Sequence, residues 1–109
     1  MRIEKINKLI KKEVGNIILE EVNFSPSVMV TVKDVSVSKD LRYADVFVSV
    51  FPFEKNEEVQ ALLKENIYEM QRILNKKLVM KPLPRIVFKI DDTGEYVGRI
   101  DKLINENKL

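Results

Sequence analysis

The stretch VMVTVKDVSVSKDLRYADVFVSVF, residues 28–51, decides the fold because two valine-rich runs flank one polar segment. Valine and aromatic residues favour strands, and the polar residues Ser38 to Arg42 favour a turn. In the second run the even-numbered residues are small or apolar: Ala44, Val46, Val48 and Val50. Because side chains alternate along a strand, these four share one face. The stretch therefore predicts an antiparallel hairpin with one buried face.

The first run changes its alternation halfway along. Its apolar residues are even-numbered at first and odd-numbered later: Val28, Val30 and Val32, then Val35 and Val37. A pattern with a period of two changes parity only through an extra residue. We therefore predict a β-bulge, or a strong local twist, near Lys33 or Asp34.

Both flanks of the hairpin have the three- and four-residue apolar spacing of amphipathic helices. The first helix is predicted from about Arg2 to Val22, with Ile3, Ile6, Ile10, Val14, Ile17 and Ile18 on its apolar side. The second covers about twenty residues after Pro52, with Val59, Leu62, Leu63, Ile67, Met70, Ile73, Leu74 and Leu78. Pro26 breaks the first helix, and Pro82 and Pro84 end the second.

Alternation returns after the second helix, where Ile86, Phe88 and Ile90 predict a third strand. Asp92 and Glu95 form a capping box for a short C-terminal helix carrying Val97, Ile100, Leu103 and Ile104. This order predicts an α+β fold, a two-layer sandwich with a three-stranded mixed sheet covered by helices on one face. A chain of 109 residues suits one such unit, so residues 1–109 are expected to form a single domain.

Composition excludes several kinds of chemistry. The chain has no cysteine and no histidine, so thiol nucleophiles, zinc–thiolate sites and imidazole bases are absent. Asp91, Asp92 and Glu95 match no calcium loop, and capping already uses two of them. No apolar run is long enough to cross a membrane. We therefore expect a cytoplasmic protein with no cofactor, no metal and no small-molecule substrate, and the side chains left for catalysis are carboxylates, Lys, Tyr and Ser.

The element order, with the middle helical region broken in two, resembles the type II KH fold of RNA-binding proteins. The Gly-x-x-Gly loop of most KH domains is absent, because none of the three glycines lies between Glu54 and Pro84. The segment VSVSKDLRYADVFVSV resembles the signature V-S-x-D-L-x-x-A-x-V-x-V of the ribosome-binding factor A family. PRIVFKIDDTGEYVGRIDKLI is similar to the family's closing stretch, and the similarity is colinear over nearly the whole chain.

The resemblance implies a non-catalytic factor that binds the free or immature 30S small subunit and its 16S ribosomal RNA. Such a factor assists late assembly and RNA processing, is tied to growth in the cold, and is expected to act as a monomer. The family usually has an Ala-x-Gly kink between its middle helices, where this chain has Asn66, Ile67 and Tyr68. Glycine tolerates a bend that tyrosine resists, so the sequence leaves the kink undecided.

Positive charge is concentrated within one segment of the second half of the chain, residues 71–90. The chain carries only +2 overall, yet residues 71–90 contain six cations and no acid: Arg72, Lys76, Lys77, Lys81, Arg85 and Lys89. One interpretation is an RNA-binding surface, whose affinity would fall roughly a thousandfold between low and moderate salt if all six met phosphates. The other is a solvated face in which Lys76, Lys77 and Lys81 complement a helix dipole.

Further candidates lie elsewhere on the predicted surface. Lys5, Lys8 and Lys12, with Arg2, follow the exposed side of the first helix, and Lys39 and Arg42 lie in the hairpin turn. Asp40 is expected to cap N–H groups of that turn. Tyr43, Phe47 and Phe51 either offer stacking surfaces for bases or fill the less buried strand face.

Two other function classes stay open. One is a protein-binding adaptor that docks a partner by strand addition or through an exposed apolar face. The other, which we do not expect, is a magnesium-dependent nuclease that uses Asp91 or Asp92.

Overall fold

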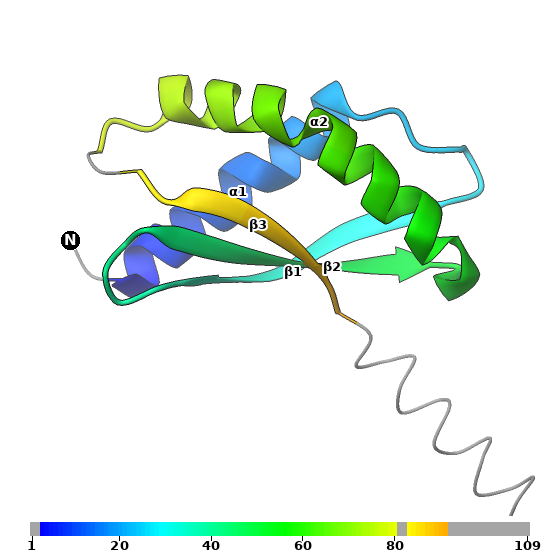
Figure 1. The fold of residues 1–109 in the computed structure, drawn as a ribbon, viewed down its shortest axis with the longest axis horizontal. Coiled ribbons are helices and arrows are strands. Elements are labelled where there is room, and N and C mark those ends of the chain that lie inside the picture. Colours follow the sequence, from blue (N-terminus) through cyan, green and yellow to red (C-terminus); the bar gives the residue numbers. More distant parts are fainter. Residues whose placement is uncertain (1–2, 81–82, 92–109) are drawn as a thin grey trace, which may run out of the picture.

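Two helices cover one face of a three-stranded sheet (Figure 1). The computed structural model describes residues 3–80 and 83–91. Its elements are α1 (Ile3–Glu21), β1 (Met29–Val37), β2 (Tyr43–Phe51), the short 3₁₀ helix η1 (Phe53–Lys55), α2 (Asn56–Lys77) and β3 (Arg85–Ile90). The two long helices, the three strands and the turn at residues 38–42 are confirmed. The expected C-terminal helix, with Asp92 and Glu95, lies outside the described residues.

The sheet has the order β1-β2-β3, so the central strand is the one with the strictest alternation. β1 and β2 are antiparallel, whereas β2 and β3 are parallel, which confirms the predicted mixed sheet. Parallel pairing is possible because α2 carries the chain back to the starting end of β2 before β3 begins. This α+β arrangement is consistent with the type II KH topology.

The predicted β-bulge lies at Lys33. Val32 pairs with Val48 and Asp34 pairs with Phe47, so the register shifts and Lys33 is the extra residue. Without that shift the two halves of β1 would bury opposite faces. With it, Val30, Val32, Val35 and Val37 all pair with the buried face of β2.

The core lies between the sheet and the two apolar helix stripes. α1 buries five side chains in it, and α2 buries four: Ile6, Ile10, Val14, Ile17 and Ile18, then Val59, Leu63, Met70 and Leu74. Within residues 3–80 and 83–91 no polar or charged residue is fully buried. The core is thus held by apolar burial alone, and every charge of the described chain is left at the surface.

α2 is helical without interruption from Asn56 to Lys77, so the expected division into two helices is a bend within one helix. Figure 1 shows that its axis changes direction near the middle. Asn66, at the middle of the helix, donates a hydrogen bond from Nδ2 to the Leu62 carbonyl at 2.8 Å. A side chain that competes for the carbonyl four residues back bends a helix. The Asn66 amide therefore accounts for a bend that contains no glycine.

We expect deletion of Lys33 to destabilise the protein by about 3–6 kcal/mol. Removing the extra residue turns two valines of β1 out of the core, and each costs about 1.5–3 kcal/mol, against about 5–15 kcal/mol for a whole domain. Thermal unfolding followed by circular dichroism measures the loss. The control Lys33→Ala keeps the extra residue and should change stability by less than about 0.5 kcal/mol. A deletion variant as stable as that control would contradict the parity argument.

Candidate nucleic-acid interface

The hairpin turn explains the sequence signature that begins at Val37. The Ser38 N–H donates to the Tyr43 carbonyl at 2.8 Å, and the Leu41 N–H donates to the Ser38 carbonyl at 2.9 Å. Leu41 has a φ of 60°, a left-handed conformation that costs a non-glycine residue energy. Its side chain offsets this cost because it packs against the core. The turn is therefore fixed in shape by both hydrogen bonds and apolar contact.

Asp40 holds the same turn from its carboxylate. Its Oδ1 accepts hydrogen bonds from the Ser38 hydroxyl at 2.7 Å and from the Arg42 N–H at 3.1 Å. The hydrogen bond from the Ser38 hydroxyl has the larger effect and that from the Arg42 N–H the next largest. Both lower the pKa of Asp40 below its ordinary 3.8. The prediction that Asp40 caps the turn is confirmed. Lys39 and Arg42 are both exposed on it.

The first turns of α1 are fastened beside this hairpin. Asn7 accepts a hydrogen bond at Oδ1 from the Val37 N–H, at 2.9 Å. Val37 is the last residue of the edge strand β1, so its N–H would otherwise have no partner within the sheet. Lys5 and Lys8, on either side of Asn7 in sequence, are exposed and lie at the same end as the turn.

The last turns of α2 are fastened to β3 through Gln71. Its Oε1 accepts from the Ile86 N–H at 2.8 Å, and its Nε2 donates to the Pro84 carbonyl at 3.2 Å. The Arg85 N–H in turn donates to the Arg42 carbonyl at 2.9 Å. These bonds bring the end of α2, the start of β3 and the hairpin turn together.

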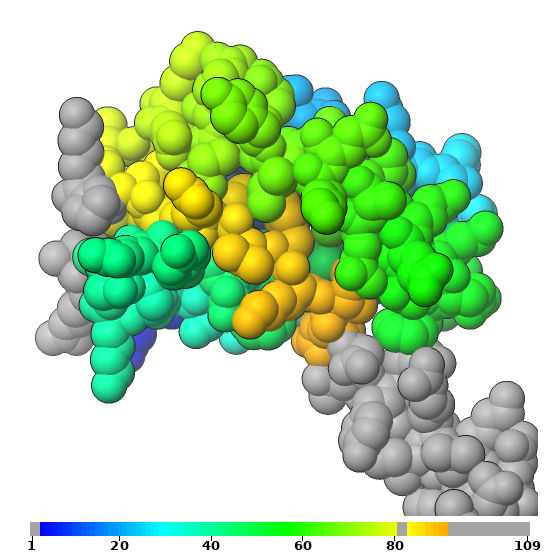
Figure 2. Space-filling view, viewed as in Figure 1, coloured from blue at the N-terminus to red at the C-terminus, as the bar shows by residue number. Residues whose placement is uncertain are grey.

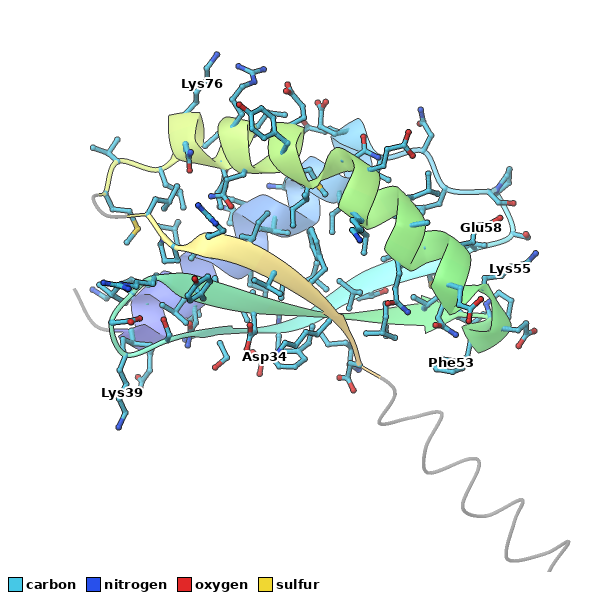
Figure 3. The ribbon with its side chains drawn as sticks, viewed as in Figure 1. Asp34, Lys39, Phe53, Lys55, Glu58 and Lys76 are labelled. Atoms are coloured by element: carbon cyan, nitrogen blue, oxygen red, sulfur yellow. The ribbon has the colours of Figure 1, made fainter. Side chains whose placement is uncertain are left out.

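Seven of the predicted cations consequently gather at one end of the molecule, which we call the basic end. All seven are exposed: Lys5, Lys8, Lys39, Arg42, Lys76, Lys77 and Arg85. Figure 3 shows Lys39 and Lys76 at this end, far from Lys55 and Glu58, with Lys76 pointing away above α2 and Lys39 pointing away below the turn. In Figure 2 the turn, the end of α2 and β3 form one continuous face. Lys12 is exposed one helical turn beyond Lys8.

Among the described residues, three of the predicted cations have a carboxylate partner: Arg42 of the basic end, whose Nε lies 3.8 Å from Asp40 Oδ2, and also Arg72 and Lys89. The Arg72 guanidinium is paired with Glu69, whose carboxylate raises the pKa of Arg72, while the arginine lowers the pKa of Glu69. Lys89 Nζ lies 3.2 Å from Asp45 Oδ2 across the sheet. Lys81 lies outside the described residues. The acid-free sequence window therefore does not mean that its cations have no acidic partners.

Of the three aromatic candidates, Tyr43 alone lies beside the basic end. It pairs with Arg85 in the sheet and is half exposed. Phe51 is 73% exposed, but it ends β2 at the opposite end of the molecule. Phe47 lies half-buried on the open sheet face. A common stacking platform of all three rings is therefore not formed.

The acidic candidates offer no catalytic centre in the described part of the chain. No three carboxylates there come close enough to hold a metal ion. Asp91 directly follows β3, where its N–H donates to the Val48 carbonyl at 2.7 Å. Asp92 and Glu95 lie outside the described residues. The described helices also include none long and apolar enough to span a membrane.

Three polar residues of this end were not among the sequence candidates: Asn7, Gln71 and Asn75. Asn7 and Gln71 each directly follow a buried apolar position, and both are half-buried. An uncharged polar residue at the border of an apolar helical stripe is a signal for such contacts, because an amide both donates and accepts hydrogen bonds.

Fold and surface together define a two-layer α+β protein with a cationic end suited to a polyanion such as RNA. A family model described as ribosome-binding factor A matches residues 2–104. A ribosome-binding factor A from Halothermothrix orenii is 37% identical over 109 residues, covering 98% of this chain and 88% of that protein. The chain therefore belongs to the ribosome-binding factor A family, whose members are non-catalytic, ribosome-associated factors.

Solved structures agree on the fold. The crystal structure of ribosome-binding factor A from Thermus thermophilus superposes with a TM-score of 0.69 at 23% identity, covering 82% of this chain and 94% of that one. A homology model of the Thermus thermophilus factor, fitted into a cryo-EM map of a 30S complex, gives 0.66 at 22% identity, with coverages of 84% and 96%.

We expect Gln71→Ala to destabilise the protein by about 1–3 kcal/mol, because it leaves the Ile86 N–H and the Pro84 carbonyl without their partner. Urea denaturation measures the change, and hydrogen exchange at the Ile86 amide should become faster. The matched control is Gln60→Ala on the same helix, because the exposed Gln60 amide donates only to the Asn56 side chain among the described residues. Equal effects of the two substitutions would contradict the role assigned to Gln71.

The Asp40 carboxyl should titrate below its ordinary pKa, and Ser38→Ala should raise that pKa because it removes the stronger hydrogen bond. An acidic group whose pKa is lower in the folded than in the unfolded protein stabilises the fold at pH values above its unfolded-state pKa. This stabilisation is lost as the pH falls through the pKa of the folded state. An NMR titration of the side-chain carboxyl carbon checks both statements. The same Asp40 pKa in wild type and Ser38→Ala would contradict the turn geometry.

Proposed function

We propose that this chain is a ribosome maturation factor that binds the free or immature 30S small subunit and its 16S ribosomal RNA. It acts in the cytoplasm, as a single-domain protein, and assists late assembly and RNA processing. A factor of this kind favours one RNA conformation over another and makes or breaks no covalent bond. The cell needs such a factor most in the cold, because misfolded RNA helices rearrange slowly at low temperature.

The observation that carries the proposal is the gathering of seven exposed cations at the basic end. Phosphate contacts by Lys and Arg give sequence-independent affinity and release counterions, so binding weakens steeply with salt. Family membership supports the small ribosomal subunit as the binding partner, because a homology model of the Thermus thermophilus factor has been fitted into a cryo-EM map of a 30S complex. The other predicted cations remain predicted RNA contacts outside the basic end as defined here: Lys12, Arg72, Lys81 and Lys89.

A protein-binding adaptor is the second candidate, and one observation favours it. A hollow of about 460 Å³ lies at the end opposite to the turn, and three exposed apolar side chains line it: Leu19, Met29 and Phe51. Exposed apolar clusters of this kind often mark protein contacts. An adaptor would bind in a salt-tolerant manner, and its binding would be lost on Phe51→Glu rather than on removal of lysines.

Sedimentation with free small subunits, large subunits and whole ribosomes tests the leading proposal. We expect wild type to prefer free small subunits, and Lys76→Glu combined with Lys77→Glu to weaken binding at least about tenfold at low salt. The matched control, Lys55→Glu combined with Lys64→Glu, makes the same charge change on exposed residues away from the basic end. Equal pelleting with all three particles, or equal loss in both double variants, would contradict the proposal.

A further inference from the structure

A hollow of about 390 Å³ lies within the basic end, between the last turns of α2 and the start of β3. Among the described residues its lining is formed by Gln71, Asn75, Met80, Leu83 and Arg85. This volume is in the range of small-ligand pockets, about 300–1,000 Å³. Met80 and Leu83 give it an apolar wall, and the other three residues give it polar groups.

The polar groups of the hollow are fixed in orientation by Gln71. Because Gln71 Oε1 is used by the Ile86 N–H, its Nε2 is turned to donate to Asn75 Oδ1, at 3.1 Å. That contact occupies the acceptor atom of the Asn75 amide and leaves its Nδ2 group as a donor. Within the described residues this group has no acceptor.

Arg85 adds a positive charge at the rim of the same hollow. Its backbone is anchored to Arg42, and no carboxylate of the described residues lies within ion-pair distance of its guanidinium. Arg72 and Lys89, the cations next along α2 and β3, both have such partners. The unpaired guanidinium therefore lies beside the apolar wall of Met80 and Leu83. The described lining residues provide the hydrogen-bond donors of Asn75 and Arg85 and include no carboxylate.

We propose that this hollow holds one unpaired nucleotide of an RNA, an inference that rests on the proposed function and names the RNA feature recognised. The base lies against Met80 and Leu83 and accepts a hydrogen bond from Asn75 Nδ2, and its phosphate meets Arg85. A base within a duplex is covered by its neighbours and its pairing partner, so only a bulged or looped nucleotide can enter. The lysines of the basic end hold the flanking phosphates.

The test compares two fluorescent RNA probes in anisotropy titrations with the full chain. One is a duplex with a single bulged nucleotide, and the other is the same duplex fully paired. We expect wild type to bind the bulged RNA at least about fivefold more tightly, and Asn75→Ala to remove about fivefold of that preference, the effect of one hydrogen bond. Asn75 is exposed in the last turn of α2, and circular dichroism confirms that the variant stays folded.

Lys77→Ala is the matched control, because Lys77 belongs to the basic end but does not line the hollow. It should weaken binding to both probes equally and lower the salt slope by about one. Arg85→Lys keeps the charge but not the planar fork, and should reduce the preference for the bulged probe.

Three outcomes would overturn the inference. Wild type could bind the two probes equally or not at all, Asn75→Ala could keep the full preference, or AMP could displace the bulged RNA at concentrations similar to that of the RNA itself. The last would assign the hollow to a free nucleotide. Retained selectivity for free small subunits in sedimentation, together with any of these, would leave the proposed function standing while removing the nucleotide site.

Discussion

Two side-chain amides, those of Asn7 and Gln71, fasten the helices to the two edges of the sheet, and the placement of the basic end depends on them. Each accepts a hydrogen bond from an edge-strand N–H, that of Val37 or that of Ile86. Apolar burial holds the layers together, but it has no direction along a helix axis. The directional amide contacts fix which helical turns meet which strand ends, and so place α1's first lysines and α2's last lysines at the same end of the molecule, at opposite edges of the sheet.

The bulge at Lys33 makes these contacts possible from the sheet side. It lets β1 present valines to the helices along its whole length, so that the strand reaches the hairpin turn with Val37 still in the core. Without it, α1 would have an apolar surface to cover over only half of β1. The charged residues are then excluded from the core and collect where the chain turns, because turns and helix ends are the parts left in water.

Much of this fold follows from the sequence because its cause is periodicity. The parity change at Val32 and Val35 predicted the bulge, and the helical spacing predicted the bounds of the first helix within one residue at each end. The second helix was predicted to end at Pro82 and Pro84, but it ends at Lys77. The ion pairs were not predictable in the same way. Asp45 reaches Lys89 across the sheet, and Glu69 lies just before the acid-free window that contains Arg72. A linear window cannot detect partners brought close by strand pairing, nor the amide contacts of Gln71, which depend on how α2 is placed against β3.

The account's central claim is that the basic end, and not the opposite end, lies against the small subunit's RNA. The chain has no native cysteine, so single cysteines can carry a tethered iron reagent for hydroxyl-radical cleavage. Val79→Cys places the reagent on a fully exposed residue just after α2 without removing a charge, and Glu58→Cys places it at the far end shown in Figure 3. We predict strong, localised cleavage of small-subunit RNA from position 79 and little from position 58. Equal cleavage from both, or stronger cleavage from position 58, would contradict the account.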